Sequence, residues 1–162
     1  MEGTARLIVM RHGQAGELPG GPDIERALTP QGRGDSAAAG AWLRDGGYRP
    51  DQVICSAARR ARQTWQHVSE VLGSHPALAT EQRVYRANAA ELAEIVREVP
   101  DEVRTLMVVG HNPAVGELSA MLTGAEMAFP AGAIAVIEVV GGWAGLSPAE
   151  AELHASWTPA GG

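Results

Sequence analysis

The sequence contains no lysine. All 13 Lys-or-Arg positions among its 162 residues are arginine. A chain without lysine has no P-loop lysine and forms no lysine Schiff base, so two large classes of site chemistry are excluded. The single cysteine, Cys55, excludes an internal disulfide and fits a reducing compartment. The five histidines show no paired spacing typical of metal ligands, and we expect neither a metal nor another cofactor.

Long apolar runs and a basic excess are also missing. No apolar run approaches the roughly 20 residues that a membrane span needs, and the first residues lack a signal-peptide core. We therefore expect a cytoplasmic protein without membrane contact. The formal net charge of −6 argues against a nucleic-acid partner. The length fits a single domain over residues 1–162, and although the oligomeric state stays open, we favour a monomer.

The sequence does contain a strand-like apolar run that ends in polar groups. Residues 7–10 (LIVM) are followed at once by Arg11, His12 and Gly13. Four large apolar residues in a row are typical of a strand buried on both faces of a parallel sheet. Because ligands bind at the carboxyl ends of strands in open α/β sheets, we expect Arg11 and His12 on the rim of a binding crevice.

Two further apolar runs end in a similar way, at residues 53–55 and 106–109. An arginine cluster follows the first run and an imidazole follows the second: Arg59, Arg60, Arg62 and His111. Three strand ends thus deliver cationic or imidazole groups to one edge of the predicted sheet. Arginine presents a rigid fork of donors that matches a phosphoryl group, so the sequence predicts a phosphate site.

The predicted elements alternate between strands and helices, which favours an α/β layered fold. Four helices are expected to begin at the caps Thr29, Ser56, Asn88 and Asn112, and a last pair of strands at residues 133–140 and 152–157. The helix after Thr29 is expected to end near Asp45 and to turn Ala37, Ala38, Ala41 and Trp42 inward. Its glycines weaken the prediction, since each costs about 1 kcal/mol relative to alanine.

Histidine at a phosphate site has two possible duties. It donates hydrogen bonds to phosphate oxygens, or it attacks phosphorus through an unprotonated nitrogen. Nearby arginines disfavour the imidazolium form and keep a nucleophilic histidine neutral near pH 7. The sequence supplies two candidates, His12 and His111, and the simplest interpretation gives one duty to each.

At these residues the sequence resembles a known family. Residues 11–13 (RHG), 56–64 (SAARRARQT) and 108–113 (VVGHNP) resemble the histidine phosphatase superfamily, also called phosphoglycerate-mutase-like. The short length and residues 25–35 (ERALTPQGRGD) resemble its SixA-like phosphohistidine phosphatase branch. The resemblance implies a three-layer α/β/α sandwich with a mostly parallel central sheet. It also implies a covalent phosphohistidine intermediate.

The resemblance assigns roles to particular residues. It implies that His12 is the nucleophile, that Arg11 binds phosphate and that His111 stabilises the transferring phosphoryl group. The family's pocket arginine stands four residues after the strand-end serine, which selects Arg60; Arg59 and Arg62 are expected in solvent. The remaining candidate substrate-binding residues are Arg26, which matches an arginine at the substrate entrance of the branch, Gln14 and Asn112.

One departure concerns the proton donor. Many relatives carry a glutamate in a segment resembling Glu-Arg-x-Tyr, but here glutamine stands there, as Gln82, after Glu81. Glu81 is a candidate donor, with Glu17 and solvent as alternatives. The leaving group of a phosphohistidine depends less on protonation by a general acid than that of an alkyl phosphate. We therefore expect a metal-independent phosphatase acting on phosphohistidine, for instance in a phosphotransfer protein. A phosphatase of small phosphomonoesters and a non-catalytic module that binds phosphate or phosphoproteins are the alternatives.

Overall fold

A six-stranded sheet forms the centre of the molecule, of which the computed structural model describes residues 3–160. The strands are β1 (Thr4–Arg11), β2 (Gln52–Ser56), β3 (Ala77–Glu81), β4 (Thr105–Gly110), β5 (Ile134–Val140) and β6 (Ala151–Trp157). They lie in the order β3-β2-β4-β1-β5-β6. The first four run parallel to one another, whereas β5 is antiparallel to β1 and β6. The sheet is mostly parallel, as predicted.

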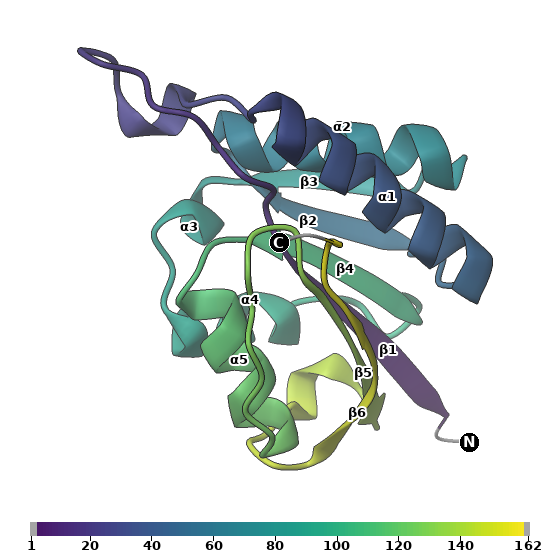
Figure 1. The fold of residues 1–162 in the computed structure, drawn as a ribbon. Coiled ribbons are helices and arrows are strands. Elements are labelled where there is room, and N and C mark those ends of the chain that lie inside the picture. Colours follow the sequence, from purple (N-terminus) through teal and green to yellow (C-terminus); the bar gives the residue numbers. More distant parts are fainter. Residues whose placement is uncertain (1–2, 161–162) are drawn as a thin grey trace.

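Helices cover both faces of this sheet (Figure 1). They are α1 (Pro30–Gly46), α2 (Arg59–Leu72), α3 (Gln82–Tyr85), α4 (Ala89–Arg97) and α5 (Ala114–Thr123), with the 3₁₀ turns η1 (Asp23–Glu25) and η2 (Trp143–Gly145). α1 and α2 pack on one face, and α4 and α5 pack on the other. The predicted three-layer α/β/α sandwich is therefore confirmed. Among the helices of residues 3–160, none has both the length and the apolar character that crossing a bilayer requires.

β1 lies in the middle of the sheet and is buried on both sides. Leu7 and Val9 belong to the apolar core shared with α4 and α5, whereas Ile8 and Met10 belong to the core shared with α1 and α2. All four side chains are fully buried. The continuous apolar run thus reflects a strand covered by helices on both faces.

The ends of α1 agree with the prediction. The Thr29 hydroxyl accepts a hydrogen bond from the Gly32 amide, Pro30 is the first helical residue and Gly47 ends the helix with a φ of 75°. A left-handed residue of this kind satisfies the last carbonyl groups of a helix, and glycine adopts it without a steric penalty.

The predicted inner face of α1 is only partly right, because Trp42 packs against the core but Ala38 is exposed. The buried residues are Gly32, Ser36, Ala39, Gly40 and Leu43. A Cβ on Gly40 would lie 2.6 Å from the carbonyl oxygen of Val68 in α2, so the glycine allows the two helices to touch backbone to backbone. Glycine belongs here to the packing surface, which hydrophobicity alone does not reveal.

Two predicted helix caps are also wrong, while a third is confirmed. α2 follows Ala58, and the Ser56 hydroxyl lies in a turn, where it accepts from the Ala58 amide at 3.1 Å. α5 follows Pro113 rather than Asn112. The capping box of Asn88 and Glu91 at the start of α4 has both of its expected hydrogen bonds.

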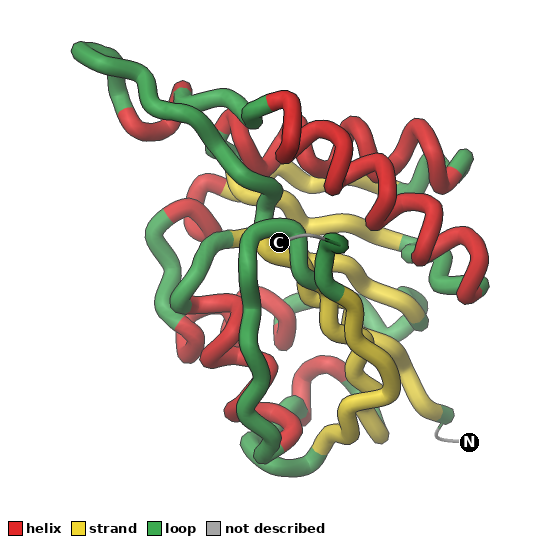
Figure 2. The backbone as a smooth tube through the Cα atoms, viewed as in Figure 1, coloured by secondary structure: helices red, strands yellow, loops and turns green. Residues whose placement is uncertain are grey.

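The segment after β1 is the long polar loop that the sequence predicted over residues 13–28. It projects beyond the layers of the sandwich before it returns to α1 (Figure 2). Ala15 and Leu28 form an isolated bridge at its base, and η1 lies on its returning half. The sequence predicted neither η1 nor β3 and α3. The loop matters for function because η1 reaches the edge of the sheet where β1 ends, as its contacts with Arg60 show.

Candidate active site

The end of β1 presents Arg11 and His12 at the carboxyl edge of the parallel strands. The His12 amide donates to the carbonyl of Gly110, the last residue of β4, at 3.0 Å. A Cβ on Gly13 would lie 2.9 Å from the backbone oxygen of Gly32 in α1. The glycine therefore lets the chain leave the strand in close contact with α1, and this fixes the direction in which the preceding histidine points.

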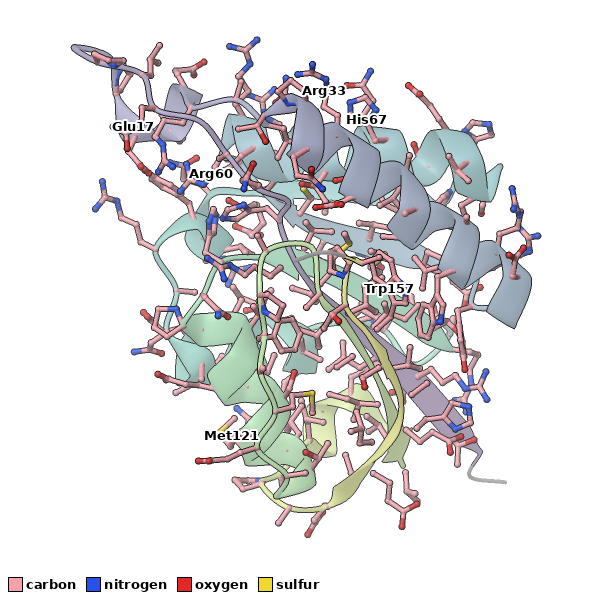
Figure 3. All side chains as sticks on the ribbon, in the orientation of Figure 1. Glu17, Arg33, Arg60, His67, Met121 and Trp157 are labelled. Atoms are coloured by element: carbon pink, nitrogen blue, oxygen red, sulfur yellow. The ribbon has the colours of Figure 1, made fainter. Side chains whose placement is uncertain are left out.

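Side chains from three strand ends meet at this edge. The Nε of Arg60, in the first turn of α2, donates to His12 Nε2 at 3.3 Å. The Arg60 Nη2 lies 3.5 Å from His111 Nδ1, and the two imidazole rings are 5.0 Å apart between centroids. Arg60 lies beneath the extended loop (Figure 3) and its side chain is 8% exposed. Arg59 and Arg62 are exposed instead, as predicted.

The hydrogen bonds of His12 identify which ring nitrogen is unprotonated. Its Nδ1 lies 2.7 Å from the Gly13 carbonyl, which only accepts, so Nδ1 carries the proton. Nε2 is therefore unprotonated, and its lone pair accepts the hydrogen bond from Arg60 Nε. Burial lowers the pKa of His12 to about 3, with a smaller contribution from the charges of His111, Arg60 and Arg11. The sequence attributed a neutral imidazole to the arginines, but burial is the larger cause.

His111 has the opposite arrangement of protons. Its Nδ1 faces Arg60, which only donates, and its Nε2 lies 2.7 Å from the Ser56 hydroxyl. Nε2 therefore carries the proton and donates it to Ser56. Burial, and then the charge of Arg60, lowers the pKa of His111 to about 4. The fully buried Ser56 thus holds this ring, a role distinct from the helix cap that the sequence predicted.

One nitrogen of the Arg11 guanidinium is anchored, and another has no hydrogen-bond partner among the described residues. Its Nη1 donates to the Phe129 carbonyl at 3.1 Å, and Asn112 Nδ2 donates to the same oxygen at 2.9 Å. The Arg11 Nε is buried and has no hydrogen-bond partner within residues 3–160. Burial also lowers the pKa of its guanidinium. A buried donor without a partner is unfavourable, and an oxyanion beside it would satisfy it.

Asp23 of η1 is the site residue that the sequence missed. Its Oδ2 accepts from Arg60 Nη2 at 3.0 Å and from the Tyr85 hydroxyl at 2.5 Å, and its carbonyl accepts from Arg60 Nη1. Arg26 Nη1 donates to Oδ1 at 2.9 Å. These donors lower the pKa of Asp23 well below its usual range. The one sequence signal was the three-residue spacing of Asp23 and Arg26.

Two predicted substrate contacts are occupied by loop hydrogen bonds. The Gln14 side chain accepts from the Thr29 hydroxyl at 2.7 Å, so it braces the loop against α1. Arg26 donates to the Gly16 carbonyl at 2.9 Å and contacts the pocket through Asp23. Asn112 supports the segment at Phe129, as described above. The structure thus brings His12, Arg60, His111 and Arg11 together. Gln14, Arg26 and Asn112 lie around this cluster.

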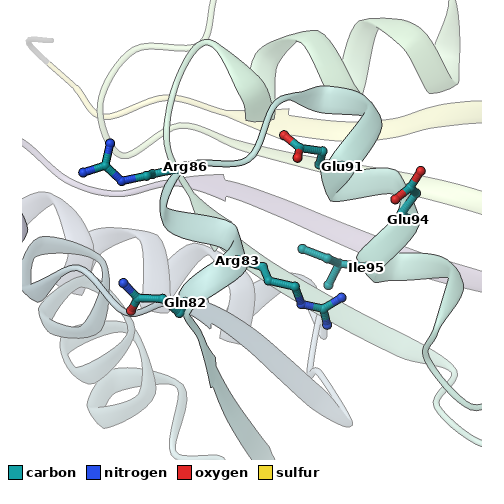
Figure 4. A pocket seen from close by; sticks show the side chains of 6 residues that line it. All are labelled: Gln82, Arg83, Arg86, Glu91, Glu94 and Ile95. Atoms are coloured by element: carbon teal, nitrogen blue, oxygen red, sulfur yellow. The ribbon is translucent and has the colours of Figure 1, made fainter.

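Glu81, the candidate proton donor, is engaged elsewhere. Arg83 donates to both of its carboxylate oxygens, at 3.0 and 3.1 Å, and also pairs with Glu98. The ion pair lowers the pKa of Glu81, which favours the charged form that has no proton to give. A hollow of about 210 Å³ beside this pair lies between α3 and α4 (Figure 4). Its lining residues are Gln82, Arg83, Arg86, Glu91, Glu94 and Ile95.

A second hollow, of about 300 Å³, lies along the extended loop. It is lined by Glu17, Leu18, Pro19, Gly21, Asp23 and Arg26. Because Asp23 belongs both to this hollow and to the cluster around Arg60, the hollow adjoins the predicted phosphate site. The hollow between α3 and α4 shares no lining residue with that cluster.

Comparison with known proteins agrees with this geometry. The model of the histidine phosphatase superfamily (branch 1) matches residues 7–104. An uncharacterised protein of Mycobacterium tuberculosis is 36% identical over 155 residues, which cover 89% of this chain and 96% of that protein. The structure of a candidate phosphohistidine phosphatase SixA from Nakamurella multipartitia is 32% identical, with a TM-score of 0.87 and 98% of each chain covered.

The same fold also occurs with other substrates. A mycobacterial glucosyl-3-phosphoglycerate phosphatase has a TM-score of 0.70 at 18% identity, covering 93% of this chain and 97% of its own. The fold therefore does not select between protein and small-molecule substrates. The family model, the relative's identity and the cluster of two imidazoles and two arginines agree on one conclusion. This chain belongs to the histidine phosphatase superfamily, branch 1.

Proposed function

We propose that this protein is a metal-independent phosphatase that hydrolyses phosphohistidine on a partner protein through a covalent intermediate on His12. The observation that carries the proposal is the state of His12. Its proton is fixed on Nδ1 by the Gly13 carbonyl, and its lone pair on Nε2 lies beside Arg60. A neutral imidazole nitrogen next to a guanidinium is poised to attack a phosphorus atom whose oxygens the guanidinium binds.

The surrounding donors fit the oxygens of a phosphoryl group. Arg11 contributes the buried Nε that lacks a partner among the described residues, and Arg60 contributes a planar pair of donors. A bound dianion favours protonation of His111 at Nδ1, which would then donate a further hydrogen bond. Arg11, Arg60 and His111 are thus proposed as phosphate ligands.

The reaction proceeds in two balanced transfers. The lone pair of His12 Nε2 forms a bond to phosphorus while the bond from phosphorus to the leaving atom breaks and its electron pair stays on that atom. Water then attacks the phosphoryl group, the bond to Nε2 breaks, and His12 returns to its neutral form. The second transfer releases inorganic phosphate, and the proton of the water passes to solvent or phosphate.

The lack of a carboxylic acid in its usual place supports a phosphoramidate substrate. Gln82 has no acidic proton, and Glu81 is ion-paired with Arg83. An alkoxide leaving group needs a proton as it departs, whereas a phosphohistidine ring already protonated on its other nitrogen departs neutral. This difference favours phosphohistidine over small esters.

The first test uses His12→Ala. We expect the variant to lose turnover of a phosphohistidine peptide and to lose the acid-labile label that the wild type acquires from radiolabelled substrate. His67→Ala, a change in α2 outside the cluster, is the matched control and should keep both. Substantial turnover by His12→Ala would refute the covalent mechanism.

Substrate preference needs a second measurement. The wild type should show a higher kcat/KM for the phosphohistidine peptide than for a panel of sugar and nucleotide phosphates. A clear preference for a small ester would establish the alternative of a phosphomonoester phosphatase. Tight phosphate binding without hydrolysis of any compound would establish a binding module.

A further inference from the structure

The carboxylate of Asp23 lies on the exposed side of Arg60. Its Oδ2 is 3.0 Å from Arg60 Nη2, the same nitrogen that faces His111 Nδ1. The side chain of Asp23 is 50% exposed, whereas that of Arg60 is 8% exposed. The carboxylate thus lies on the solvent side of the arginine, whose Nε contacts the half-buried His12.

Asp23 is held in this position by three different elements. Besides Arg60 of α2, the Tyr85 hydroxyl of α3 donates to Oδ2 and Arg26 of the loop donates to Oδ1. Tyr85 also packs edge-on against the His111 ring, with centroids 5.6 Å apart. The position of the carboxylate is therefore fixed relative to both histidines, although η1 belongs to a long loop.

The contacts of Asp23 also define what it offers to a ligand. All three side-chain contacts are donors to its oxygens, and together they lower its pKa. Ionised carboxylates only accept hydrogen bonds. When phosphate oxygens take over Arg60 Nη2, a lone pair of Oδ2 becomes free toward the solvent side. A ligand group there must present a hydrogen-bond donor, and a positively charged donor gains most from the ionised carboxylate.

In-line attack puts the leaving atom on the side of phosphorus away from His12. A phosphohistidine ring leaving on that side carries an N–H on its second nitrogen. A sugar phosphate presents neutral hydroxyl donors there, which gain less from a carboxylate than a protonated imidazole does. A phosphoglycerate presents a second negative charge, which a carboxylate repels.

We propose that Asp23 is the specificity-determining residue of this site, where its carboxylate accepts the N–H of the leaving imidazole. This inference rests on the proposed function. The carboxylate favours the protonated ring before transfer. The bond between phosphorus and the ring nitrogen then breaks, its electron pair returns to that nitrogen, and the ring leaves neutral with its N–H still hydrogen-bonded to Asp23. No proton passes from Asp23.

The test uses Asp23→Asn, which keeps the shape of the side chain and removes its charge. The substrates are a phosphohistidine peptide, p-nitrophenyl phosphate and an alkyl phosphate. Hydrogen bonds to charged groups are worth enough that the ratio of kcat/KM between the peptide and p-nitrophenyl phosphate should fall about tenfold or more. Glu25→Gln, which removes a charge from the same turn, should leave this ratio unchanged.

The pH profile supplies a readout that a structural role would not move. In the wild type the carboxylate keeps the bound ring protonated, so kcat for the peptide should persist to higher pH than in Asp23→Asn. The alkaline limb of p-nitrophenyl phosphate hydrolysis should lie at the same pH in both proteins.

Several results would overturn the proposal. An equal loss on all substrates would mean that Asp23 only positions Arg60, and an equal gain would mean that it only competes with phosphate. A loss greatest on the alkyl phosphate would identify a proton donor. A wild type that prefers esters to the peptide refutes the proposed function itself. A wild type that prefers the peptide, with the same preference in Asp23→Asn, refutes only the role of Asp23.

Discussion

At the scale of single residues, each pocket imidazole has one ring nitrogen held by a fixed partner. The Gly13 carbonyl holds His12 through Nδ1, and the Ser56 hydroxyl holds His111 through Nε2. These two contacts decide which nitrogen faces Arg60 in each ring. The position of a proton, and with it the proposed division into nucleophile and phosphate ligand, thus depends on neighbours that carry no charge.

Ser56→Ala tests this dependence. The change leaves the His111 Nε2–H and the Ala58 amide without their shared acceptor, so we expect a loss of about 1–3 kcal/mol in the free energy of unfolding. We also expect a lower kcat, because the ring is free to turn. Urea unfolding and steady-state kinetics are the measurements.

Ser119→Ala is the matched control for Ser56→Ala. Ser119 is equally buried, but its hydroxyl donates to the Val115 carbonyl within α5. Its replacement should affect stability without lowering kcat. If the two variants have the same kcat, Ser56 has no role in orienting His111.

The sequence identified most pocket residues but not Asp23, and the reason is local. His12 and His111 follow apolar strands whose pattern fixes their place, and the family resemblance selected Arg60 among three arginines after a third strand. Asp23 lies in a polar loop without periodicity, and its contacts with Arg60 and Tyr85 span 37 and 62 positions in the chain. Contacts between residues so far apart in the sequence form only when the chain has folded, so no local pattern predicts them.

At the scale of elements, the glycines of α1 show how backbone proximity replaces side-chain burial. Gly32 lies against the backbone of Gln14, and Gly40 lies against Val68 of α2. A Cβ added to Gly34 of the same helix would meet no atom within 4 Å. Hydrophobic periodicity treats the three alike, so it misplaced the buried face of the helix, whereas the Thr29 cap and the terminal glycines predicted its ends correctly.

Gly40→Ala should therefore destabilise the protein. The added methyl group would approach the Val68 carbonyl within 2.6 Å, and overpacking of this kind costs about 1–3 kcal/mol. Gly34→Ala, in open space on the same helix, should instead gain up to about 1 kcal/mol from helix propensity. Thermal unfolding of both variants distinguishes the two environments, and a similar change in both would contradict close packing of α1 on α2.

Helix caps show where local sequence suffices and where it does not. Asn88 and Glu91 satisfy each other, so their capping box was predictable from four residues. Ser56 and Asn112 accept from the nearby amides of Ala58 and Gly116, but they also bond to His111 and to the Phe129 carbonyl. A polar side chain beside an active site has partners from other elements, and these compete with the local cap.

At the scale of the whole molecule, strand order creates the site. β2, β4 and β1 are neighbours in the sheet and run parallel, so their carboxyl ends meet at one edge. The helices on both faces bury that edge enough to lower the pKa of His12 and His111. The neutral imidazoles are thus a consequence of the sandwich as a whole.

Burial of neutral histidines gives the protein a pH-dependent stability. The pKa values of about 3 and 4 in the folded state lie below 6.5, so between pH 6.5 and about 4 the unfolded chain binds protons that the folded chain does not. The free energy of unfolding should fall as the pH falls through this range, by up to about 1.4 kcal/mol per pH unit and histidine.

Urea unfolding at several pH values checks this prediction. His12→Asn should reduce the slope of stability against pH, whereas His75→Asn, a change at an exposed position, should not. Asp23 loses its ion pairs only below its ordinary pKa of 3.8, so its contribution lies outside the range. Equal slopes in the wild type and His12→Asn would show that His12 is not buried in its neutral form.

The sequence by itself determined every strand except β3, both ends of α1, the start of α4 and the residue types at the strand ends, because these depend on neighbours a few positions away. Apolar runs, a capping box and the motif of residues 11–13 are local patterns. Only the tertiary structure decided which ring nitrogen is free, which face of α1 is buried and that Asp23 contacts Arg60. Those outcomes depend on groups that are distant in the chain and are brought together by the sheet and its covering helices.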